Sequence, residues 1–367
     1  MKVLLIHATI GWGHKRAALA LAEAFQERGI ETEVHDLLDF IPWPISRLYP
    51  SAYSFMVSRS RPLWRLFYKI NDLPKSPYAP ANAWTQRWQF TKFFSFLQEN
   101  KFNFIVSTHF TPSALLLDWR KKLNSNFGVY SVVTDFVSHR CWKRDGLDHY
   151  FVATQEVKNE LVECGFAADK ITIAGIPISR SFSQPLLREE SRNEWNIKDH
   201  EKLVLVLSSG LSPSKTRTMI QDLKEFPGNI RYLVSAGKEA PREQQIQRFC
   251  GSDKRFTVFG FSPRIAEMMR AADVLISKPG GLTVSEALSL GLPQILFSPI
   301  PGQEEANAQY VVRHGAGACI EAKKGHFKSA LAKFLNDAES LKAAKKSANN
   351  LGKPHAASTI VDFILKQ

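Results

Sequence analysis

The chain has 367 residues, of which 44% are hydrophobic and 23% charged, so a wholly disordered protein is excluded and two globular domains are expected. Its 48 Lys and Arg against 35 Asp and Glu give a net charge of +13, which indicates an anionic partner: nucleic acid, an anionic membrane or a phosphorylated substrate. Four scattered cysteines disfavour a disulfide framework or a zinc site and fit the reducing cytosol. No apolar run approaches the ~20 residues of a transmembrane helix.

The N-terminal residues predict a strand, a helix and a second strand. Val3–Ile6 is an uninterrupted apolar run, as in a parallel strand that is buried on both faces. A helix is expected from about Lys15 to Arg28, with Gly29 at its C-terminal cap, followed by a strand over Thr32–His35.

The turn Gly11-Trp12-Gly13-His14 joins this strand to the helix, where backbone amides attract anions or polar groups. A dinucleotide fingerprint needs a glycine near position 16, and this chain has Arg16 there. An NAD site is therefore disfavoured, although Asp36 lies where a ribose-binding acid would. The alternatives are a purely structural turn and a functional one, in which the imidazole of His14 acts as a general base.

A basic, aromatic stretch interrupts the pattern between Trp43 and Lys101. It holds 14 aromatic residues, nine Lys or Arg and two acids, which gives a local charge of +7. Repeated prolines exclude one long helix there. The stretch fits the headgroup layer of a membrane, where Trp and Tyr gather and basic residues meet anionic lipids. Packing in the core is the alternative for about half of these aromatics. Nucleic acid is disfavoured because it leaves the later motifs without a purpose.

Strands then alternate with polar turns and helices through the rest of the chain. This alternation predicts two doubly wound α/β domains, whose ligands bind beyond the carboxyl ends of the strands. The hydrophilic stretch 188–201 is the predicted linker. The predicted strands are Phe104–Ser107, Val129–Thr134, Tyr150–Ala153, Ile171–Ala174, Leu203–Leu207, Arg231–Val234, Phe256–Phe259, Asp273–Ser277 and Gln294–Phe297.

Polar motifs follow several of these strands. Asp135, in Thr134-Asp135-Phe136, could orient His14 or contact a substrate hydroxyl, or could simply cap the next helix. In the segment Ser277–Ala287, two glycines and a helix start suit a phosphate. Glu286, one turn into that helix, could bind ribose hydroxyls, and the alternative is a carboxylate on a solvated face.

Two further turns suit a sugar nucleotide. Ser208-Ser209-Gly210 is a small-residue turn for phosphate, and the segment Pro301–Ala308 offers amide and acid groups to sugar hydroxyls. The chain contains no Asp-x-Asp, which disfavours a transferase that holds its nucleotide through a metal-binding acid pair.

In combination these motifs resemble GT-B glycosyltransferases of family 28. The resemblance is strongest to the branch with monogalactosyldiacylglycerol synthases and processive diacylglycerol glucosyltransferases. It covers about Ile6 to Tyr310, and Trp12 stands where relatives often have a glycine. The matching motifs are Gly11-x-Gly13-His14-x-x-Ala17, Val133-Thr134-Asp135-Phe136, Lys278-Pro279-Gly280-Gly281-Leu282-Thr283 and Gln303-Glu304-x-x-Asn307-Ala308.

The resemblance implies a GT-B fold of two Rossmann-like domains that face a cleft. Residues 1–182 would bind the acceptor and the membrane, residues 183–350 the UDP-sugar, and residues 351–367 would form a helix that crosses back to the first domain. We expect His14 to be the base, with Asp135 as orienter or alternative base. The implied donor-binding residues are Arg180, Ser209, Gly210, Phe259, Phe261, Lys278, Gly280, Gly281, Thr283, Glu286, Gln303, Glu304 and Asn307.

The expected function is an inverting transfer of a hexose from a UDP-sugar to a membrane lipid, with diacylglycerol as the first choice of acceptor. No cofactor or metal is expected, and the protein would work in the cytoplasm at the inner face of the membrane. The alternatives are a polyprenyl-linked or other lipophilic acceptor, and a UDP-sugar epimerase on the same fold. The acceptor and membrane residues would be Gly11, Gly13, Trp43, Arg59, Arg61, Trp64, Arg65 and Lys69.

Overall fold

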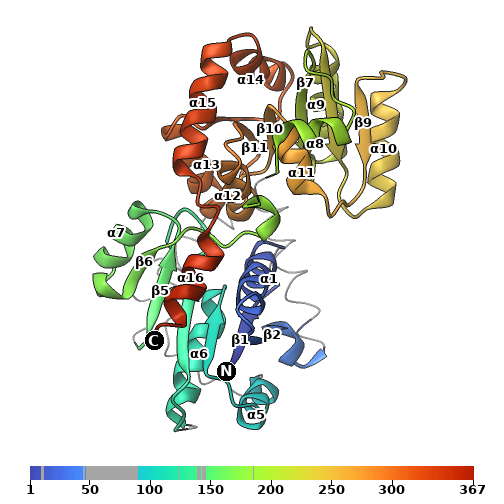
Figure 1. The fold of residues 1–367 in the computed structure, drawn as a ribbon. Helices are drawn as coiled ribbons and strands as arrows, with labels where there is room; N and C mark the ends of the chain where they lie inside the picture. The colour runs from blue at the N-terminus through green and yellow to red at the C-terminus, as the bar shows by residue number, and fades with distance from the viewer. Residues whose placement is uncertain are drawn as a thin grey trace. The chain divides into compact units, whose positions relative to one another are not determined.

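The structure is a computed structural model that describes residues 1–9, 12–43, 46, 90–122, 124–138, 142, 146–184 and 186–367. The chain forms two compact units, each around its own six-stranded sheet of parallel strands (Figure 1). Unit 1 comprises Met1–Arg180, Ile300–Gln303 and His355–Gln367, and unit 2 comprises Ser181–Pro299 and Glu304–Pro354.

The sheet of unit 1 has the strand order β2-β1-β3-β4-β5-β6. All of its neighbouring strands are parallel, as the continuous apolar runs predict. Its elements are β1 (Lys2–His7), α1 (Trp12–Gln26), β2 (Glu31–Asp36), the 3-10 helix η1 (Leu37–Phe40), α5 (Thr91–Glu99), β3 (Phe104–Ser107), α6 (Phe110–Lys122), β4 (Gly128–Val132), β5 (His149–Val152), α7 (Gln155–Glu163), η5 (Ala168–Lys170), β6 (Ile171–Ile173) and α16 (Ala356–Ile364).

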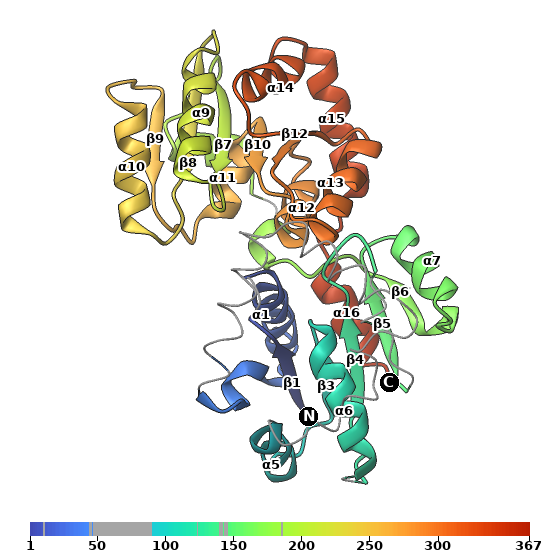
Figure 2. The same cartoon turned by 180° about the vertical axis from the view of Figure 1, so that it is seen from behind.

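Alternate residues of β1 face opposite layers of helices. Val3 and Leu5 belong to one apolar cluster with α1 and α16, whereas Leu4 and Ile6 belong to another with α5, α6 and α7. Figures 1 and 2 show α1 and α16 side by side on their face of the sheet, and Arg28 pairs with Asp362 between these two helices. The last helix therefore completes the core of unit 1, although residues 181–355, most of them in unit 2, separate it from Arg180 in the sequence.

The sheet of unit 2 has the strand order β12-β11-β10-β7-β8-β9, again with parallel neighbours. Helices α9 and α14 cover the face that buries Val204 and Val206 of β7. The elements of this half are α8 (Arg188–Glu194), β7 (Lys202–Leu207), α9 (Pro213–Lys224), β8 (Ile230–Ser235), α10 (Ala240–Cys250), β9 (Phe256–Phe259), α11 (Ile265–Ala271), β10 (Val274–Ser277), α12 (Gly281–Ser289), β11 (Gln294–Phe297), α13 (Gln303–Arg313), β12 (Gly317–Ile320), α14 (His326–Leu335) and α15 (Ala338–Leu351).

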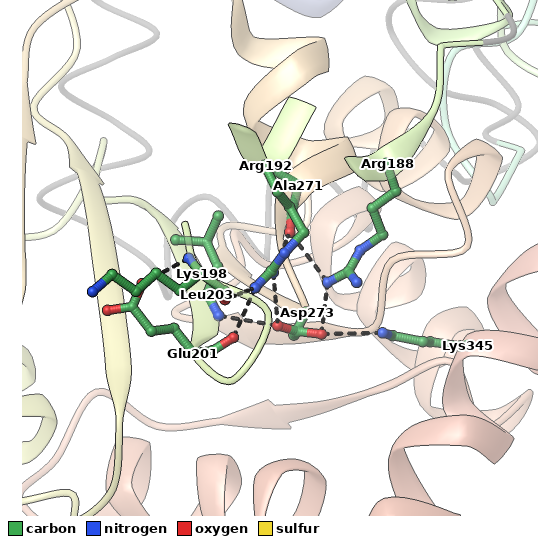
Figure 3. Close-up of polar contacts among 8 residues, drawn as sticks. All are labelled: Arg188, Arg192, Lys198, Glu201, Leu203, Ala271, Asp273 and Lys345. Atoms are coloured by element: carbon green, nitrogen blue, oxygen red, sulfur yellow. Dashed lines mark hydrogen bonds and ion pairs between the residues drawn. The ribbon is translucent and has the colours of Figure 1, made fainter. Parts of the chain in front are cut away.

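The predicted linker over residues 188–201 is wrong, because this stretch is built into unit 2. Its first part is the helix α8, which carries Arg188 and Arg192 to the buried carboxylate of Asp273, just before β10 (Figure 3). Arg188 Nη2 lies 2.8 Å and Lys345 Nζ 3.2 Å from Asp273 Oδ1, and the amide of Leu203 donates to Oδ2 at 3.0 Å. Burial alone would raise the pKa of Asp273, but the charges of Arg188 and Lys345 hold it below its usual value.

Candidate active site

The two sheets share a topological feature that predicts where ligands bind. In unit 1 the chain runs from β1 outward to β2 on one side, and returns to β3 on the other side of β1. In unit 2 the same reversal lies between β7 and β10. In open parallel sheets the crevice beyond the carboxyl ends of the strands at such a reversal is the usual ligand site.

His14 lies at the reversal of unit 1. Helix α1 begins at Trp12, three residues before the predicted start, so His14 is in the first helical turn directly after β1. Its Nδ1 lies 2.8 Å from the carbonyl oxygen of Thr108, the residue that follows β3. The hydroxyl of Thr108 in turn donates to the carbonyl oxygen of His14 at 2.9 Å. These two contacts join the loops that follow β1 and β3.

The contact with Thr108 fixes the tautomer of His14. A carbonyl oxygen only accepts hydrogen bonds, so Nδ1 must carry the ring hydrogen and Nε2 presents its lone pair. The hydroxyl of Thr134, after β4, lies 2.9 Å from the same Nδ1 atom. Burial lowers the pKa of His14 to about 4, although the hydrogen bond to Thr108 acts in the opposite direction. The ring is therefore neutral at pH 7 and has one basic nitrogen.

A second histidine packs against the ring of His14. His109, also at the end of β3, meets the His14 ring edge-on, with centroids 4.8 Å apart, and stacks on Phe110 at 4.2 Å. Burial lowers the pKa of His109 well below its usual value, so this ring is neutral too and adds no charge beside His14.

Sequence reasoning singled out Asp135 as the group that orients His14, but it missed the two threonines beside Nδ1. The polar run Ser107-Thr108-His109 at the end of β3 was the available signal, because polar residues that follow a buried strand face the ligand side. The role of Asp135 stays a prediction.

Of the predicted acceptor and membrane residues, Gly13 lies in the first turn of α1, and Trp43 is 72% exposed. Outside the described residues lie Gly11, Arg59, Arg61, Trp64, Arg65 and Lys69.

We expect Thr134→Val to lower kcat about three- to tenfold, because one hydrogen-bonding hydroxyl next to Nδ1 contributes roughly 0.5–1.5 kcal/mol. Steady-state kinetics from pH 8 down to about 4 checks this, because the acid limb lies near the His14 pKa of about 4 and should move with the altered imidazole. Thr134→Ser keeps the hydroxyl and should restore the rate. A Thr134→Val enzyme with an unchanged rate and profile would show that this hydroxyl does not position His14.

At the reversal of unit 2, the loops after β7 and β10 touch. Gly210 has a φ of 81°, and a Cβ atom there would lie 2.7 Å from Cδ of Lys278. Lys278 Nζ lies 3.4 Å from Oε2 of Glu304, in the first turn of α13. Only a glycine meets both demands at position 210, since it tolerates the left-handed backbone and leaves room for the lysine.

The loop after β10 leads into a helix start suited to an anion. Gly280 is the N-cap of α12 and makes no side-chain cap, and a Cβ atom there would meet nothing within 4 Å. The first amides of α12 have no acceptor within their own helix, and the helix dipole favours negative charge at that end. The amide of Asn307 donates to the carbonyl oxygen of Pro279 at 3.0 Å and so holds this loop from α13.

The remaining donor candidates surround these two loops or lie in their helices. Thr283 and the buried Glu286 are in α12, and Gln303 is the first residue of α13. Phe259 ends β9, and Phe261 beyond it is 67% exposed. Ser209 follows β7.

Lys238, which sequence reasoning missed, lies with its Nζ 5.0 Å from the centre of the Phe261 ring. It follows Gly237, whose φ is 80° and at which a Cβ atom would lie 3.2 Å from the hydroxyl of Ser209. The ends of β7, β8 and β9 thus meet at one edge. Gly237, which follows β8, was the feature of the sequence that could have drawn attention to Lys238.

Arg180 ends the main segment of unit 1. Its guanidinium pairs with Glu27 of α1 at 2.7 Å, and its backbone amide donates to Glu23 at 3.1 Å. Its predicted contact with a donor phosphate stays a prediction.

Comparison with known proteins identifies the family. Residues 14–178 match the family described as monogalactosyldiacylglycerol (MGDG) synthase, and residues 211–360 match the glycosyltransferase family 28 C-terminal domain. The chain is 30% identical, over 100% of its length and 94% of the relative, to a processive diacylglycerol beta-glucosyltransferase of Bacillus cytotoxicus. The chain belongs to this glycolipid-forming branch of glycosyltransferase family 28. The predicted resemblance and the predicted enzyme class, a hexosyltransferase, are both confirmed.

Solved structures confirm the GT-B fold of this family 28 glycosyltransferase. MurG of Acinetobacter baumannii superimposes with a TM-score of 0.63 at 15% identity, over 100% of this chain and 99% of that one. UDP-GlcNAc 2-epimerase of Neisseria meningitidis gives 0.61 at 16% identity, over 100% of both chains. At such identities the likeness concerns the fold alone, so it does not favour the epimerase alternative over the transferase that the family matches identify.

Proposed function

We propose that this transferase moves a hexose from a UDP-sugar to the hydroxyl of diacylglycerol, and that the glycolipid formed has β configuration. Similarity over the whole chain to the Bacillus cytotoxicus enzyme supports this acceptor and this product. Unit 1, with the catalytic histidine, would take the lipid, and unit 2 the UDP-sugar. We place the division between acceptor and donor domains near residue 182, with the last helix, from residue 351 onward, returned to the acceptor domain.

The observation that carries the mechanism is the 2.8 Å contact between His14 Nδ1 and the carbonyl oxygen of Thr108. With Nδ1–H committed to Thr108, Nε2 is the atom that can accept a proton. In the proposed step the acceptor oxygen attacks C1 of the hexose as its proton passes to Nε2. The bond from C1 to the phosphate oxygen breaks, and UDP leaves with that electron pair. Attack on the face opposite the leaving group inverts the configuration at C1.

The leaving UDP gains negative charge, which unit 2 is suited to stabilise. The amides of Gly280 and Gly281 at the start of α12, together with Ser209, would bind the diphosphate. Lys278, and Arg180 from unit 1, would add positive charge. We assign Gln303, Glu304 and Asn307 to the sugar, Glu286 to the ribose, and the Phe259–Phe261 segment to the uracil. No metal is needed in this scheme.

We further propose that the enzyme is processive, so that its glycolipid product can return as the acceptor of a second sugar. Its relatives carry this property in their names. The same base can serve both steps, because each acceptor presents a hydroxyl.

We propose that the enzyme acts at a membrane surface. Along the residues that the structure describes, there is no helix with the length and apolar character needed to cross a bilayer. The basic, aromatic stretch between Trp43 and Lys101, with its charge of +7, supports peripheral binding to the anionic inner leaflet from the cytoplasm. Nucleic acid is not a proposed partner.

The direct test is a donor and acceptor screen. The purified enzyme is incubated with radiolabelled UDP-glucose, UDP-galactose or UDP-N-acetylglucosamine and liposomes that contain diacylglycerol or a polyprenyl phosphate, and lipid products are separated by chromatography. We expect label in a glycosyl-diacylglycerol. Label only in the polyprenyl lipid would replace the proposed acceptor, and no label in any lipid would contradict the proposal.

We expect Glu286→Ala to weaken UDP binding about ten- to hundredfold, because charge-assisted hydrogen bonds to ribose hydroxyls are worth roughly 1.5–3 kcal/mol. Titration calorimetry with UDP checks this. Since Glu286 is buried, Glu286→Gln provides a variant of the same shape, and the exposed Glu339→Ala in the same unit is the matched control. Unchanged UDP affinity in folded Glu286 variants would remove this residue from the donor site.

A further inference from the structure

A cavity in unit 1, lined by both polar and apolar residues, is not used by the transfer step proposed above. It has a volume of about 610 Å³, within the range of roughly 300–1,000 Å³ that is usual for small-molecule sites. It lies beyond the carboxyl end of β2, between η1 and the start of α5. Its lining residues are Thr9, Asp36, Leu38, Asp39, Ile41, Trp43, Ser46 and Lys92.

The cavity belongs to the same sheet edge as His14. Strands β1 and β2 are parallel neighbours with His7 opposite Asp36, so both end at this edge. The amide of Thr9 donates to Asp36 Oδ1 at 3.2 Å and ties the loop after β1 to the cavity. That loop leads directly into the helix turn that carries His14. The cavity lies beyond β2, and the reversal lies between β1 and β3, so the two are one strand apart in the sheet. Neighbouring strands are only ~4.8 Å apart.

The walls of the cavity are held in place by packing. The Phe40 ring of η1 lies 4.9 Å from the ring of Phe93 and 5.2 Å from that of Phe96, both in α5. Asp36 caps η1 through a hydrogen bond from the amide of Leu38 at 3.0 Å. This fixes η1, which carries Asp39, against α5, which carries Lys92, so the site is preformed on both sides.

The lining selects a neutral, hydroxyl-rich ligand. Asp36 and Asp39 offer carboxylate oxygens to hydroxyl donors, and the ammonium of Lys92 donates to hydroxyl oxygens. A phosphate would face two carboxylates and one ammonium. His7, 3.8 Å behind Asp36, does not restore the balance, because burial lowers its pKa and leaves it neutral at pH 7. A hydrocarbon tail would desolvate these charges without pairing them.

Trp43 adds an aromatic side chain to the lining residues. This side chain is 72% exposed, and the turn that presents it is closed by the amide of Ser46, which donates to the carbonyl oxygen of Pro42 at 3.2 Å. A sugar ring has hydroxyl groups at its edge and C–H groups on its face. Carboxylates, an ammonium and an aromatic face around one cavity match both parts.

We propose that this cavity binds the sugar headgroup of a glycosyl-diacylglycerol when the first product returns as an acceptor. The inference rests on the proposed function and assigns the second transfer to a distinct subsite. Diacylglycerol, which has no sugar, leaves the cavity empty and reaches His14 without it. Asp39 is therefore a specificity residue for the second transfer only, whereas Asp36 also caps η1 and Trp43 also belongs to the stretch assigned to the membrane.

The test compares two acceptors in the same mixed micelles. Wild type and Asp39→Asn are assayed with UDP-glucose on diacylglycerol and on glucosyl-diacylglycerol. We expect kcat/KM for glucosyl-diacylglycerol to fall about ten- to hundredfold in Asp39→Asn, and that for diacylglycerol to change less than about threefold. Glu99→Gln, an exposed acid on α5 away from the cavity, is the matched control and should change neither value. Thermal unfolding verifies that each variant is folded.

A soluble probe gives a second measurement. Octyl β-D-glucoside below its micelle concentration should compete with glucosyl-diacylglycerol in the wild type and lose most of this effect in Asp39→Asn. Equal losses on both acceptors, no loss on either, or a wild type that glycosylates diacylglycerol but not its product would each overturn the inference. Failure of the wild type on diacylglycerol itself would instead contradict the proposed function, so the two failures are distinguishable.

Discussion

Replacing His14 with Ala should lower kcat about 10²–10⁴-fold and leave UDP affinity nearly unchanged. A positioned general base contributes rate of this order, and none of the assigned donor contacts is made by His14, since all of them except Arg180 and Gln303 lie in unit 2. The structure gives the physical reason, because Nδ1 of His14 is committed to Thr108 at 2.8 Å and Nε2 is left as the acceptor of a proton. Single-turnover kinetics at saturating donor measures the chemical step, and calorimetry measures UDP binding.

The pH dependence adds a second readout of the same base. Burial holds the pKa of His14 at about 4 in the free protein, so the ring is unprotonated over the whole neutral range. The rate should therefore fall only as the pH drops toward 4, where Nε2 becomes protonated. Asp135→Asn is the companion variant: a larger loss than in His14→Ala would make Asp135 the base. Loss of UDP binding in His14→Ala with normal turnover at saturating donor would contradict the assignment.

Much of the fold follows from the hydrophobic pattern. Continuous apolar runs such as Val3–Ile6 predict strands that are buried on both faces, and the sheets are indeed parallel. The last strand, β12, escaped prediction because Gly317–Ile320 is short and opens with a glycine. That glycine has a tertiary cause: a Cβ atom there would lie 2.2 Å from the carbonyl oxygen of Gln294 on β11. No local pattern reports such a contact.

The predicted linker fails for a related reason. A hydrophilic sequence is typical of a solvated connection, but Arg192 and its neighbours in α8 are polar because they meet the buried carboxylate of Asp273, about 80 residues later in the chain. Sequence reasoning likewise placed His14 at a ligand-binding turn but could not find Thr108 or Thr134. Their contacts with Nδ1 depend on how three strands end at one edge, which is set by strand order.

Changing Arg59, Arg61, Arg65 and Lys69 together to Ser should weaken binding to phosphatidylglycerol vesicles by roughly 10²–10³-fold at low salt. Each basic residue near an anionic surface contributes about 1 kcal/mol, so four of them account for a change of this order. These residues lie outside the part that the structure describes, and the prediction rests on the charge of +7 between Trp43 and Lys101. Vesicle flotation measures the binding.

The matched control removes the same charge from the other unit. Lys324, Lys342, Lys346 and Lys353 are exposed in unit 2, and changing them to Ser should leave flotation nearly as strong as in the wild type. Binding of the wild type should also weaken as salt rises, because attraction beyond about 10 Å is screened at 0.1 M. Activity on a short-chain, water-dispersed diacylglycerol should suffer far less in the fourfold variant than activity on vesicles, because His14 and the donor loops are unaltered. Equal flotation of both variants and the wild type would show that the basic stretch does not bind the membrane, and its aromatics would then be core residues.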